Sequence, residues 1–598
     1  MSVPIKTNQL TYMFDKELFS KNYDIFCIRT SEKHFKNGAY IIDAPLLSNN
    51  VCSVLFKSGR EIFVLMKSNG SNKSLLKNAI LKEDGADRIT ISQVTPNSLK
   101  DDIVFQLMLN SLGNYESPLL KFNNLTGHLY CFHPNWLIRG RKSEADVVFK
   151  VPCLELRLSS EFRLNMEVHT FTSELLRNKI EFKKKKFDEY PKYIFSAHNT
   201  LRRKLKDDVG YSFIMRQTKN AKTEIAFLDI QNIDRFNPSK MGILTTVLEN
   251  FNDRFSSIAH LDFESITDYK ALDYTRSVAN ENKQAISDLL SIKPIKIVDC
   301  IDDEYSKIFC KEICDLLLSK YGIKTSCGKR VAKDHLNIRV IHNAAFYADS
   351  DDPHRIFNDV AVQHITFEDF SECSEFAIST VIHEMLIKAD LVKQKISLFD
   401  WNTLGLKDDI DFGIEVTDEQ NTKYIFMTIH PDGTFNISEQ TLNLFEANKY
   451  NQCVEIFENA KMNSVKVHGI IRDALGNINI IKDTEWFTIP EIYSIKAELA
   501  NGNTKLRGKE KRNELLSSCL DIKMFNDGVS EYYFVGTIGN GMRWLINRAA
   551  NIRKIEPFED SILMFEKLLP LMNVTFVHNG QLTIIPFPFK YLREHLNK

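Results

Sequence analysis

Three lysines gather around the end of one predicted helix, and their chemistry suits a terminal phosphate. The helix is predicted over residues 375–389, and Lys388 lies in its last turn, with Lys393 and Lys395 within a further turn or two. Lysine amines and backbone N–H groups at helix and strand ends hold phosphate oxygens by charge-assisted hydrogen bonds, which are stronger than neutral ones. Of the three, we expect Lys388 to bind most directly.

Further basic clusters suit a nucleic-acid backbone. They are Lys183 to Lys186, Arg202 to Lys206, Lys505 to Arg512, and a C-terminal set of Arg543, Arg548, Arg553 and Lys554. Such patches supply the sequence-independent part of nucleic-acid affinity. The alternative is that they are solvated helix faces, and that the C-terminal set balances Glu556, Glu559 and Asp560.

Two other chemistries are excluded by residue spacing. His383 and Glu384 begin like the zinc-protease pattern HExxH, but Ile387 occupies the position of the second histidine. The chain also has no Gly-x-x-x-x-Gly-Lys sequence, so we expect no nucleotide hydrolysis at a P-loop.

Composition indicates a globular protein of several domains. The chain has 598 residues, of which 43% are hydrophobic and 11% aromatic, enough for roughly three or four domains. The 77 Lys and Arg residues against 78 Asp and Glu residues leave a formal charge of −1, so any phosphate-binding surface must be local. The 11 cysteines, with Cys310 and Cys314 the nearest pair, fit neither a disulfide framework nor a CxxC zinc site. The sequence shows neither an apolar leader at its N-terminus nor an apolar stretch long enough to span a membrane. We therefore expect a cytoplasmic protein.

The elements of the N-terminal half carry no motif that identifies a function. Residues 1–145 read as an α+β domain, and residues 146–289 as a hairpin region and linker that contains helix over 179–206 and a strand over 224–230. The hairpin is predicted from period-two alternation in 154–158 and 162–169 on either side of a Ser-Ser turn. Its polar face either lines a channel or is solvated. This face carries Glu155, Arg157, Arg163, Asn165, Glu167 and His169.

A new domain is predicted to begin near residue 290, where strands and helices alternate. The predicted strands are 295–298, 338–341 and 360–366, and this spacing favours an α/β fold with parallel strands. A helix between the first two strands is expected to bury one face. That face comprises Ile308, Phe309, Ile313, Leu316 and Leu317.

Five short motifs in this half together resemble a known family. They are Val362–Thr366, Leu386–Asp390, Phe412–Val416, Gly469–Asp473 and Ile584–Arg593. In this order they are similar to the MID and PIWI domains of prokaryotic Argonaute-like proteins. The resemblance implies an α/β and α+β multidomain protein, with a Rossmann-like MID domain over 290–400 and an RNase H-like PIWI domain over 401–598.

The resemblance implies a pocket for the 5′ end of a guide strand. Gln363 would face that end, with Lys388, Lys393 and Lys395 close by, and Tyr347 or His354 as its aromatic residue. The chain has no lysine that matches the one usually found before the glutamine. Branches with altered pockets read other 5′ ends, or use Mg²⁺ with the C-terminal carboxylate, here that of Lys598.

The resemblance also implies where a nuclease would hold its metals. RNase H-like nucleases bind two divalent cations about 4 Å apart between three or four carboxylates. The matching positions are Glu415 on a strand over 410–416, then Asp473 or Asp483 at strand ends, and Asp560 on a late helix, with another helix expected over 439–460. Glu415 stands where active enzymes carry Asp, and Asp473 also suits a plain hairpin turn. We therefore expect a PIWI fold that binds and does not cut.

The function implied is guide-dependent nucleic-acid binding in defence against plasmids or phage. With no clear PAZ domain, the chain resembles most the plasmid-defence DdmE type, whose relatives bind DNA guides and recruit a helicase-nuclease partner. Partners would be a guide, with DNA favoured over RNA, and a complementary DNA target. The alternatives are an active guide-directed nuclease dependent on Mg²⁺ or Mn²⁺, and an RNase H-like scaffold that binds no nucleic acid.

Overall fold

The computed structural model describes most of the chain and divides it into two units. The described residues are 4–35, 50–81, 88–114, 121–125, 127–140, 147–180, 182, 186–195, 200–219, 224–272, 286–291, 293–347, 357, 359–369, 375–397, 405–417, 422–441, 448–502, 515–516, 522–535, 545–546, 549, 551–564 and 587–596. The first unit comprises Met1–Thr267, Glu485–Leu520 and Asn540–Ala550, and the second comprises Asp268–Thr484, Asp521–Gly539 and Asn551–Lys598. In the described part of the chain, no helix is long and apolar enough to cross a membrane.

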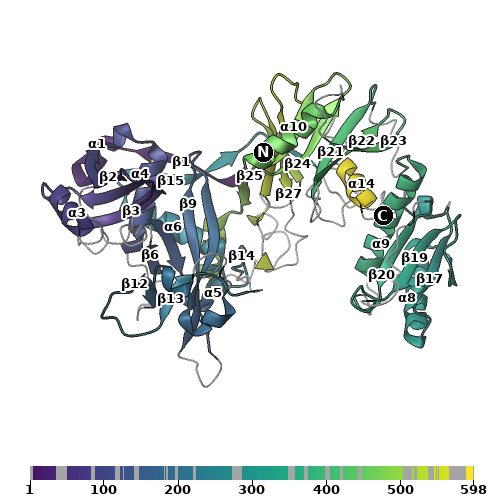
Figure 1. Ribbon diagram of the computed structural model, residues 1–598, viewed down its shortest axis with the longest axis horizontal. Helices are drawn as coiled ribbons and strands as arrows, with labels where there is room; N and C mark the ends of the chain where they lie inside the picture. The colour runs from purple at the N-terminus through teal and green to yellow at the C-terminus, as the bar shows by residue number, and fades with distance from the viewer. Residues whose placement is uncertain are drawn as a thin grey trace. The chain divides into compact units, whose positions relative to one another are not determined.

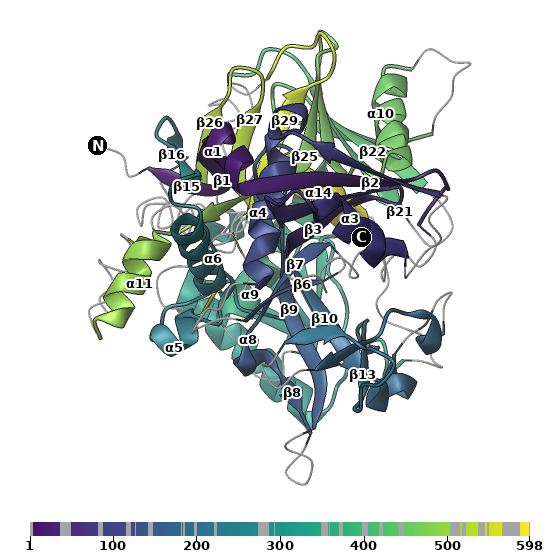
Figure 2. The same cartoon turned by 90° about the vertical axis from the view of Figure 1, so that its left-hand side faces the viewer.

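The first unit contains two main sheets (Figure 1). The smaller has the strand order β3-β4-β2-β5, and the larger has the order β12-β11-β13-β10-β9-β7-β6, with β8 paired to β9. Helix α4 packs against β3 and β9, and so contacts both sheets (Figure 2). The strands are β2 (Tyr23–Thr30), β3 (Val51–Ser58), β4 (Glu61–Lys67), β5 (Ile89–Val94), β6 (Lys121–Leu125), β7 (His128–Phe132), β8 (Ile138–Arg139), β9 (Val148–Leu158), β10 (Leu164–Ser173), β11 (Tyr193–Phe195), β12 (Leu201–Arg203) and β13 (Ser212–Met215). The helices are α1 (Lys16–Asn22), α3 (Asn72–Leu81), α4 (Asp101–Asn110), α5 (Ile233–Phe236), α6 (Lys240–Arg254) and α11 (Ile492–Ala500).

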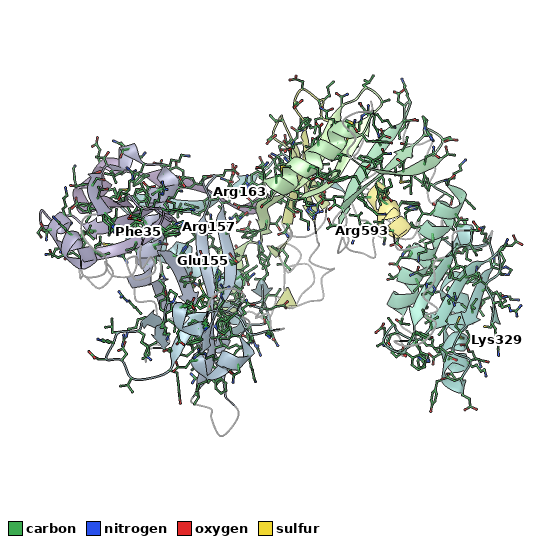
Figure 3. The ribbon with its side chains drawn as sticks, in the orientation of Figure 1. Phe35, Glu155, Arg157, Arg163, Lys329 and Arg593 are labelled. Atoms are coloured by element: carbon green, nitrogen blue, oxygen red, sulfur yellow. The ribbon has the colours of Figure 1, made fainter. Side chains whose placement is uncertain are left out.

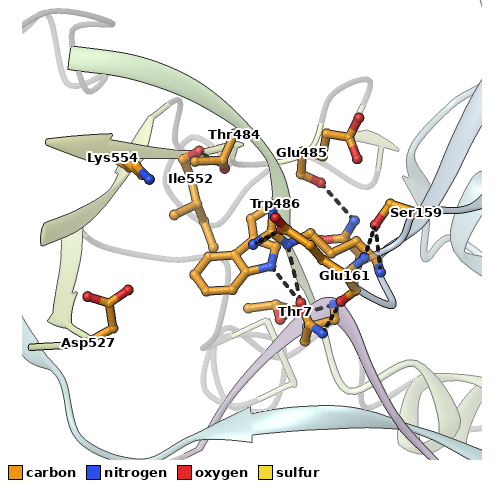
Figure 4. Close-up of polar contacts among 12 residues, drawn as sticks. Thr7, Ser159, Glu161, Thr484, Glu485, Trp486, Asp527, Ile552 and Lys554 are labelled. Carbon is orange, nitrogen blue, oxygen red and sulfur yellow. Dashed lines mark hydrogen bonds and ion pairs between the residues drawn. The ribbon is translucent and has the colours of Figure 1, made fainter. Parts of the chain in front are cut away.

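A segment from the C-terminal half completes the first unit. Strand β1 (Ile5–Phe14) pairs with β15 (Ala259–Ile266) and with the last residues of β25 (Ile478–Ile489). The Trp486 indole donates a hydrogen bond of 3.0 Å to Gln9 Oε1. Figure 4 shows Trp486 among the polar contacts of this region. A short pair of β14 (Leu228–Asp229) and β28 (Leu545–Ile546) also joins distant parts of the chain.

The predicted hairpin is confirmed as β9 and β10, and its polar face is not simply solvated, because several of its side chains contact distant segments of the chain. The Arg163 guanidinium lies 4.3 Å from the centre of the Trp486 ring, and Asn165 donates to Glu485 Oε2 at 2.9 Å. Glu155 is ion-paired, whereas Arg157 is exposed (Figure 3). Aromatic and ionic partners from distant segments therefore occupy most of this face.

The second unit contains the predicted parallel sheet. Its order is β18-β17-β19-β20, and all the pairs are parallel, as the strand and helix spacing predicted. Helix α8 begins with a capping box between Asp303 and Ser306 and ends at Gly322, whose φ of 69° suits glycine. The elements are β17 (Ile295–Asp299), α8 (Glu304–Tyr321), β18 (Thr325–Gly328), β19 (Leu336–Ile341), β20 (Val362–Thr366) and α9 (Glu375–Lys393).

The rest of the second unit is a large sheet with a helix on each face. The strand order is β16-β26-β27-β29-β25-β24-β21-β22-β23. One face buries α10 with Phe426 and Ile470, and the other packs α14 with Phe412 and Ile471 (Figure 1). The elements are β16 (Lys270–Leu272), β21 (Ile410–Thr417), β22 (Thr422–Ile429), β23 (Phe435–Gln440), α10 (Asn451–Met462), β24 (Val467–Asp473), β26 (Ile522–Asn526), β27 (Glu531–Val535), β29 (Asn551–Pro557) and α14 (Phe587–Leu596).

Several predicted boundaries are wrong. Glu439 lies on β23 and not on a helix, because Phe435 to Gln440 pair with β22. Asp483 lies inside β25, which continues to Ile489. In α8 the buried residues follow i, i+4 spacing from Phe309, so Ile308 is 59% exposed. Among the described residues of 179–206 are the strands β11 and β12 and the short turn of helix Phe187–Glu189. Residues 224–230 provide only the two residues of β14 as strand.

Candidate nucleic-acid site

Helices α9 and α14 and strand β20 together position the residues that the sequence assigned to a guide strand. Helix α9 packs on β19 and β20, and α14 packs on α9 and on β21. A close approach seats α14, because a Cβ on Gly469 would lie 2.5 Å from the Phe589 ring. Helix α14, which was expected to bring the end of the chain beside the guide site, therefore lies against α9, the helix that carries Lys388.

Four polar side chains meet where these elements join, and we name them the Lys388 cluster: Gln363, Glu384, Lys388 and Glu594. Gln363 Nε2 donates to Glu384 Oε2 at 2.7 Å. Gln363 Oε1 is buried and has no hydrogen-bond partner among the described residues. Lys388 and Glu594 are each 8% exposed. The cluster is therefore a largely buried set with one unused acceptor.

The charges in the Lys388 cluster oppose one another. Burial lowers the pKa of Lys388, and the carboxylates of Glu594 and Glu384 act against this shift. Burial and the neighbouring Glu384 raise the pKa of Glu594, while Lys590, Lys388 and Arg593 act to lower it. Arg593 itself is exposed on α14 (Figure 3). The site is thus not the purely cationic arrangement that the lysine spacing suggested.

The Lys388 cluster suits a ligand that donates hydrogen bonds. Because a carboxylate only accepts, the amide nitrogen of Gln363 must face Glu384, and the amide oxygen is left free. A hydroxyl or a base N–H group can donate to this oxygen, whereas an ionised phosphate offers acceptors alone. Buried polar atoms are rarely left unpaired, so a water molecule or a ligand group that donates a hydrogen bond would satisfy Gln363 Oε1.

Lys393 and Lys395 do not join the cluster. Five residues of helix rise about 7.5 Å and rotate about 140°, so Lys393 points to a different side of α9 from Lys388. The Lys395 backbone N–H donates to Asp390 O at 3.2 Å, and both lysine side chains are exposed. The sequence therefore grouped three lysines that the structure separates.

Asp390 fastens α14 to α9 beside the cluster. Its buried carboxylate accepts from the Tyr591 hydroxyl at 2.7 Å and from Ser397. Burial raises the pKa of Asp390 to about 6, although these hydrogen bonds act to lower it. Of the expected aromatic residues, Tyr347 accepts at its hydroxyl from the His342 N–H at 3.1 Å. His354 and Lys598 lie outside the described residues.

The carboxylates expected to hold metals are spread over the large sheet. Glu415 faces α10, where its carboxylate lies 3.7 Å from Lys461 Nζ, while Ile414 and Phe412 face the opposite side. Strand β24 runs antiparallel to β21, so that Asp473 lies opposite Ile410. Asp473 is thus five strand residues from the level of Glu415, or about 17 Å. Two metals about 4 Å apart cannot bridge that separation.

Asp473 closes the hairpin between β24 and β25. One carboxylate oxygen accepts from the backbone N–H of Asn477 and the other from its side-chain amide, both at 2.9 Å. Gly476 in the same turn has a φ of +90°. The turn interpretation of this sequence is therefore confirmed, and both oxygens of the carboxylate are engaged in it.

Asp483 and Asp560 lie elsewhere. Asp483 accepts from Arg553 Nε at 2.8 Å and lies 2.6 Å from His468 Nε2. Although burial acts to raise it, these contacts lower the pKa of Asp483. Asp560 is exposed in a turn after β29 and not on a helix. Within the described ranges, no group of three potential metal ligands includes any of the four expected carboxylates.

The C-terminal basic residues that are described make ion pairs within the protein. Arg553 is 5% exposed and bonds to Asp483, and Lys554 Nζ lies 2.5 Å from Glu556 Oε2. The alternative that Lys554 balances Glu556 is therefore confirmed. Arg543 and Arg548 lie outside the described residues.

Sequence reasoning missed the two acidic members of the Lys388 cluster. Glu384 precedes Lys388 by four residues, the spacing of facing residues on a helix, which was an available signal. Glu594 gave no local signal, because it reaches the site only through the packing of α14 on α9.

Comparisons with known proteins add a likeness to solved structures. No family model and no curated protein matches the sequence. The chain is similar to the Argonaute of Marinitoga piezophila in its crystal structure with 5′-OH guide RNA and target DNA, with a TM-score of 0.41 and 11% identity over 98% of this chain and 97% of that one. It is also similar to Drosophila Piwi, with a TM-score of 0.38 and 11% identity over 99% and 96% of the two chains.

Proposed function

We propose that the chain binds the 5′ end of a short guide strand at the Lys388 cluster and uses the guide to bind a complementary strand. The observation that carries this proposal is the buried Gln363 Oε1, which has no hydrogen-bond partner among the described residues and belongs to the side chain that bonds to Glu384, one helical turn before Lys388. It lies on elements that the Argonaute-like motifs assign to the guide's 5′ end. Sequence specificity would then come from base pairing, while the protein recognises backbone and helical shape.

The chemistry of the Lys388 cluster favours a guide that ends in a 5′ hydroxyl. A hydroxyl can donate to Gln363 Oε1, whereas a 5′ phosphate would bring added negative charge beside Glu384 and Glu594. The Marinitoga piezophila Argonaute was crystallised with 5′-OH guide RNA, which accords with this end chemistry. Guide DNA remains the expectation from the sequence motifs.

We infer that the chain does not cut the strand it binds. Glu415, Asp473 and Asp483 do not fit a two-metal centre, because they lie at separate places on the sheet and each contacts other side chains. Any effector chemistry in plasmid or phage defence would then belong to a partner protein, for which a helicase-nuclease is the expectation from the sequence motifs.

The test is to purify the chain from cells and to sequence any strand that accompanies it, after separate DNase and RNase treatment. Short strands of uniform length would support the proposal. Binding of 3′-labelled strands with 5′-hydroxyl or 5′-phosphate ends then measures the end preference.

Two variants and a control locate the binding site. Lys388→Glu and the milder Lys388→Met should weaken binding, because each removes the buried ammonium. Lys393→Glu makes the same change of charge at an exposed lysine on the same helix. This variant should bind strands about as tightly as the wild type does. Absence of both copurified and added strands would favour the scaffold alternative. Equal binding by the Lys388 and Lys393 variants would remove the site assignment.

A further inference from the structure

A separate group of metal-binding side chains lies on the larger sheet of the first unit. Glu155 on β9 pairs across the hairpin with Glu167 on β10, and His169 follows two residues later on the same face. His128 begins the neighbouring strand β7, on the other side of β9. Period-two alternation therefore brings two carboxylates and two imidazoles onto one face of three adjacent strands.

The distances within this group suit a single bound cation. His169 Nε2 lies 2.7 Å from Glu155 Oε2 and 3.7 Å from Glu167 Oε2. Ligand atoms of all three residues fall within 4.8 Å of one another. In a tetrahedral site with bonds of about 2.0–2.1 Å, neighbouring ligand atoms are about 3.3 Å apart. The observed separations lie on either side of that value, so small side-chain movements would complete the site.

The ion pairs within the group engage Glu155 more closely than Glu167. The buried His169 Nε2 lies at ion-pair distance from Glu155, whereas the Glu167 carboxylate lies farther away and has room to turn toward a bound cation. The Tyr130 ring lies edge-on to His169, with ring centres 5.9 Å apart, and limits how far the imidazole can turn. Two facing carboxylates repel each other unless a cation lies between them, and either a protonated His169 or a bound metal ion can supply that charge.

The geometry points to a divalent transition-metal site in which Glu155, Glu167 and His169 are the ligands. His128 Nδ1 lies 2.9 Å from Glu155 Oε1, the oxygen that faces away from His169, and would orient the carboxylate as outer-shell partners do. Mixed imidazole and carboxylate ligands suit Zn²⁺ and neighbouring first-row ions better than Mg²⁺. Glu167 is the exposed ligand, so the site opens to solvent and has room for a water molecule.

The test uses the full chain, stripped of metal with a chelator and titrated with Zn²⁺ by calorimetry. The wild type should bind one equivalent at this site, and Glu155→Gln and His169→Ala should each lose at least about 100-fold in affinity. His128→Ala should keep the site but weaken it by about 10- to 100-fold, as expected for an outer-shell residue. His260→Ala, which removes an exposed histidine on β15, is the matched control and should bind as the wild type does.

Co²⁺ distinguishes this site from the cysteines. Ligation by nitrogen and oxygen gives weak visible bands, whereas thiolate ligation adds an intense charge-transfer band in the near ultraviolet. Two results together support the assignment: the wild-type spectrum lacks the thiolate band, and its weak visible bands change in His169→Ala. The proposal is overturned by a dominant thiolate band, by unchanged Zn²⁺ affinity in both ligand variants, or by no Zn²⁺ binding to the wild type. Thermal unfolding without metal checks that each variant is folded.

Discussion

Replacing Glu384 by Gln should make the protein accept a 5′-phosphorylated strand that the wild type disfavours. The change removes one negative charge and keeps an oxygen that can accept from Gln363 Nε2, which now lies 2.7 Å from the carboxylate. If a 5′ phosphate occupies the place beside Gln363 Oε1, it lies about 5 Å from Glu384. At an effective dielectric constant near 20, two unit charges at that distance repel by about 3 kcal/mol. Removing the charge should therefore lower the phosphate strand's Kd by about 100-fold relative to the hydroxyl strand.

The assay compares two strands of one sequence, labelled at the 3′ end and differing only at the 5′ end. The measured quantity is the ratio of the two Kd values at one salt concentration, because salt shifts backbone affinity for both strands alike. Glu312→Gln, an exposed change on α8, is the matched control and should leave the ratio unchanged. An unchanged ratio in Glu384→Gln, with both strands bound, would refute the proposed electrostatic discrimination.

Three further predictions concern stability and chemistry. Because folded Asp390 has a pKa of about 6 against about 3.9 unfolded, its contribution to the free energy of unfolding should fall by about 2 kcal/mol from pH 4 to pH 7. Urea unfolding should show this loss in the wild type relative to Asp390→Asn, and parallel curves would refute it. Asp473→Ala should lower the free energy of unfolding by about 1–3 kcal/mol, because it removes both hydrogen bonds from Asn477. The variant should change no cleavage rate in Mg²⁺ or Mn²⁺. Metal-dependent cutting that this variant abolishes would contradict the structural role. Cys314 and Cys327, with Sγ atoms 3.4 Å apart, should form a disulfide when diamide accepts their two hydrogen atoms, and mass spectrometry should show the protein lighter by those two atoms. The reaction should be faster at high pH, because burial and the neighbouring thiol raise the pKa of Cys327 to about 11.

The parallel sheet of the second unit was predictable because its signals are local. Each strand is a short apolar run, and each helix carries buried residues at helical spacing, so order and type follow from neighbouring residues. Strand β18 was missed because Thr325–Gly328 is short and partly exposed, without an apolar run. Ile308 was misplaced because it is adjacent to Phe309 in sequence but about 100° away around the helix.

The candidate site was less predictable because it depends on contacts between distant residues. The motifs selected Gln363 and Lys388, and the structure places each of them near Glu384, by a hydrogen bond for Gln363 and by charge for Lys388. They could not show that Glu594 is also buried there, since that depends on where α14 packs. Nor could they show the antiparallel register of β21 and β24, which is set by pairing and separates Asp473 from Glu415.

Packing explains the glycines of two Argonaute-like motifs in the large sheet. These glycines therefore indicate the fold and carry no information about catalysis. A Cβ on Gly413 would lie 2.3 Å from the Phe426 ring, and one on Gly469 would lie 2.5 Å from the Phe589 ring. Neither contact involves a carboxylate. The contact at Gly469 seats α14, which in turn carries Glu594 and Tyr591 to α9. The packing of α14 therefore places Glu594 against α9 whether or not the sheet holds a metal, and the binding that we propose for the Lys388 cluster does not depend on cleavage.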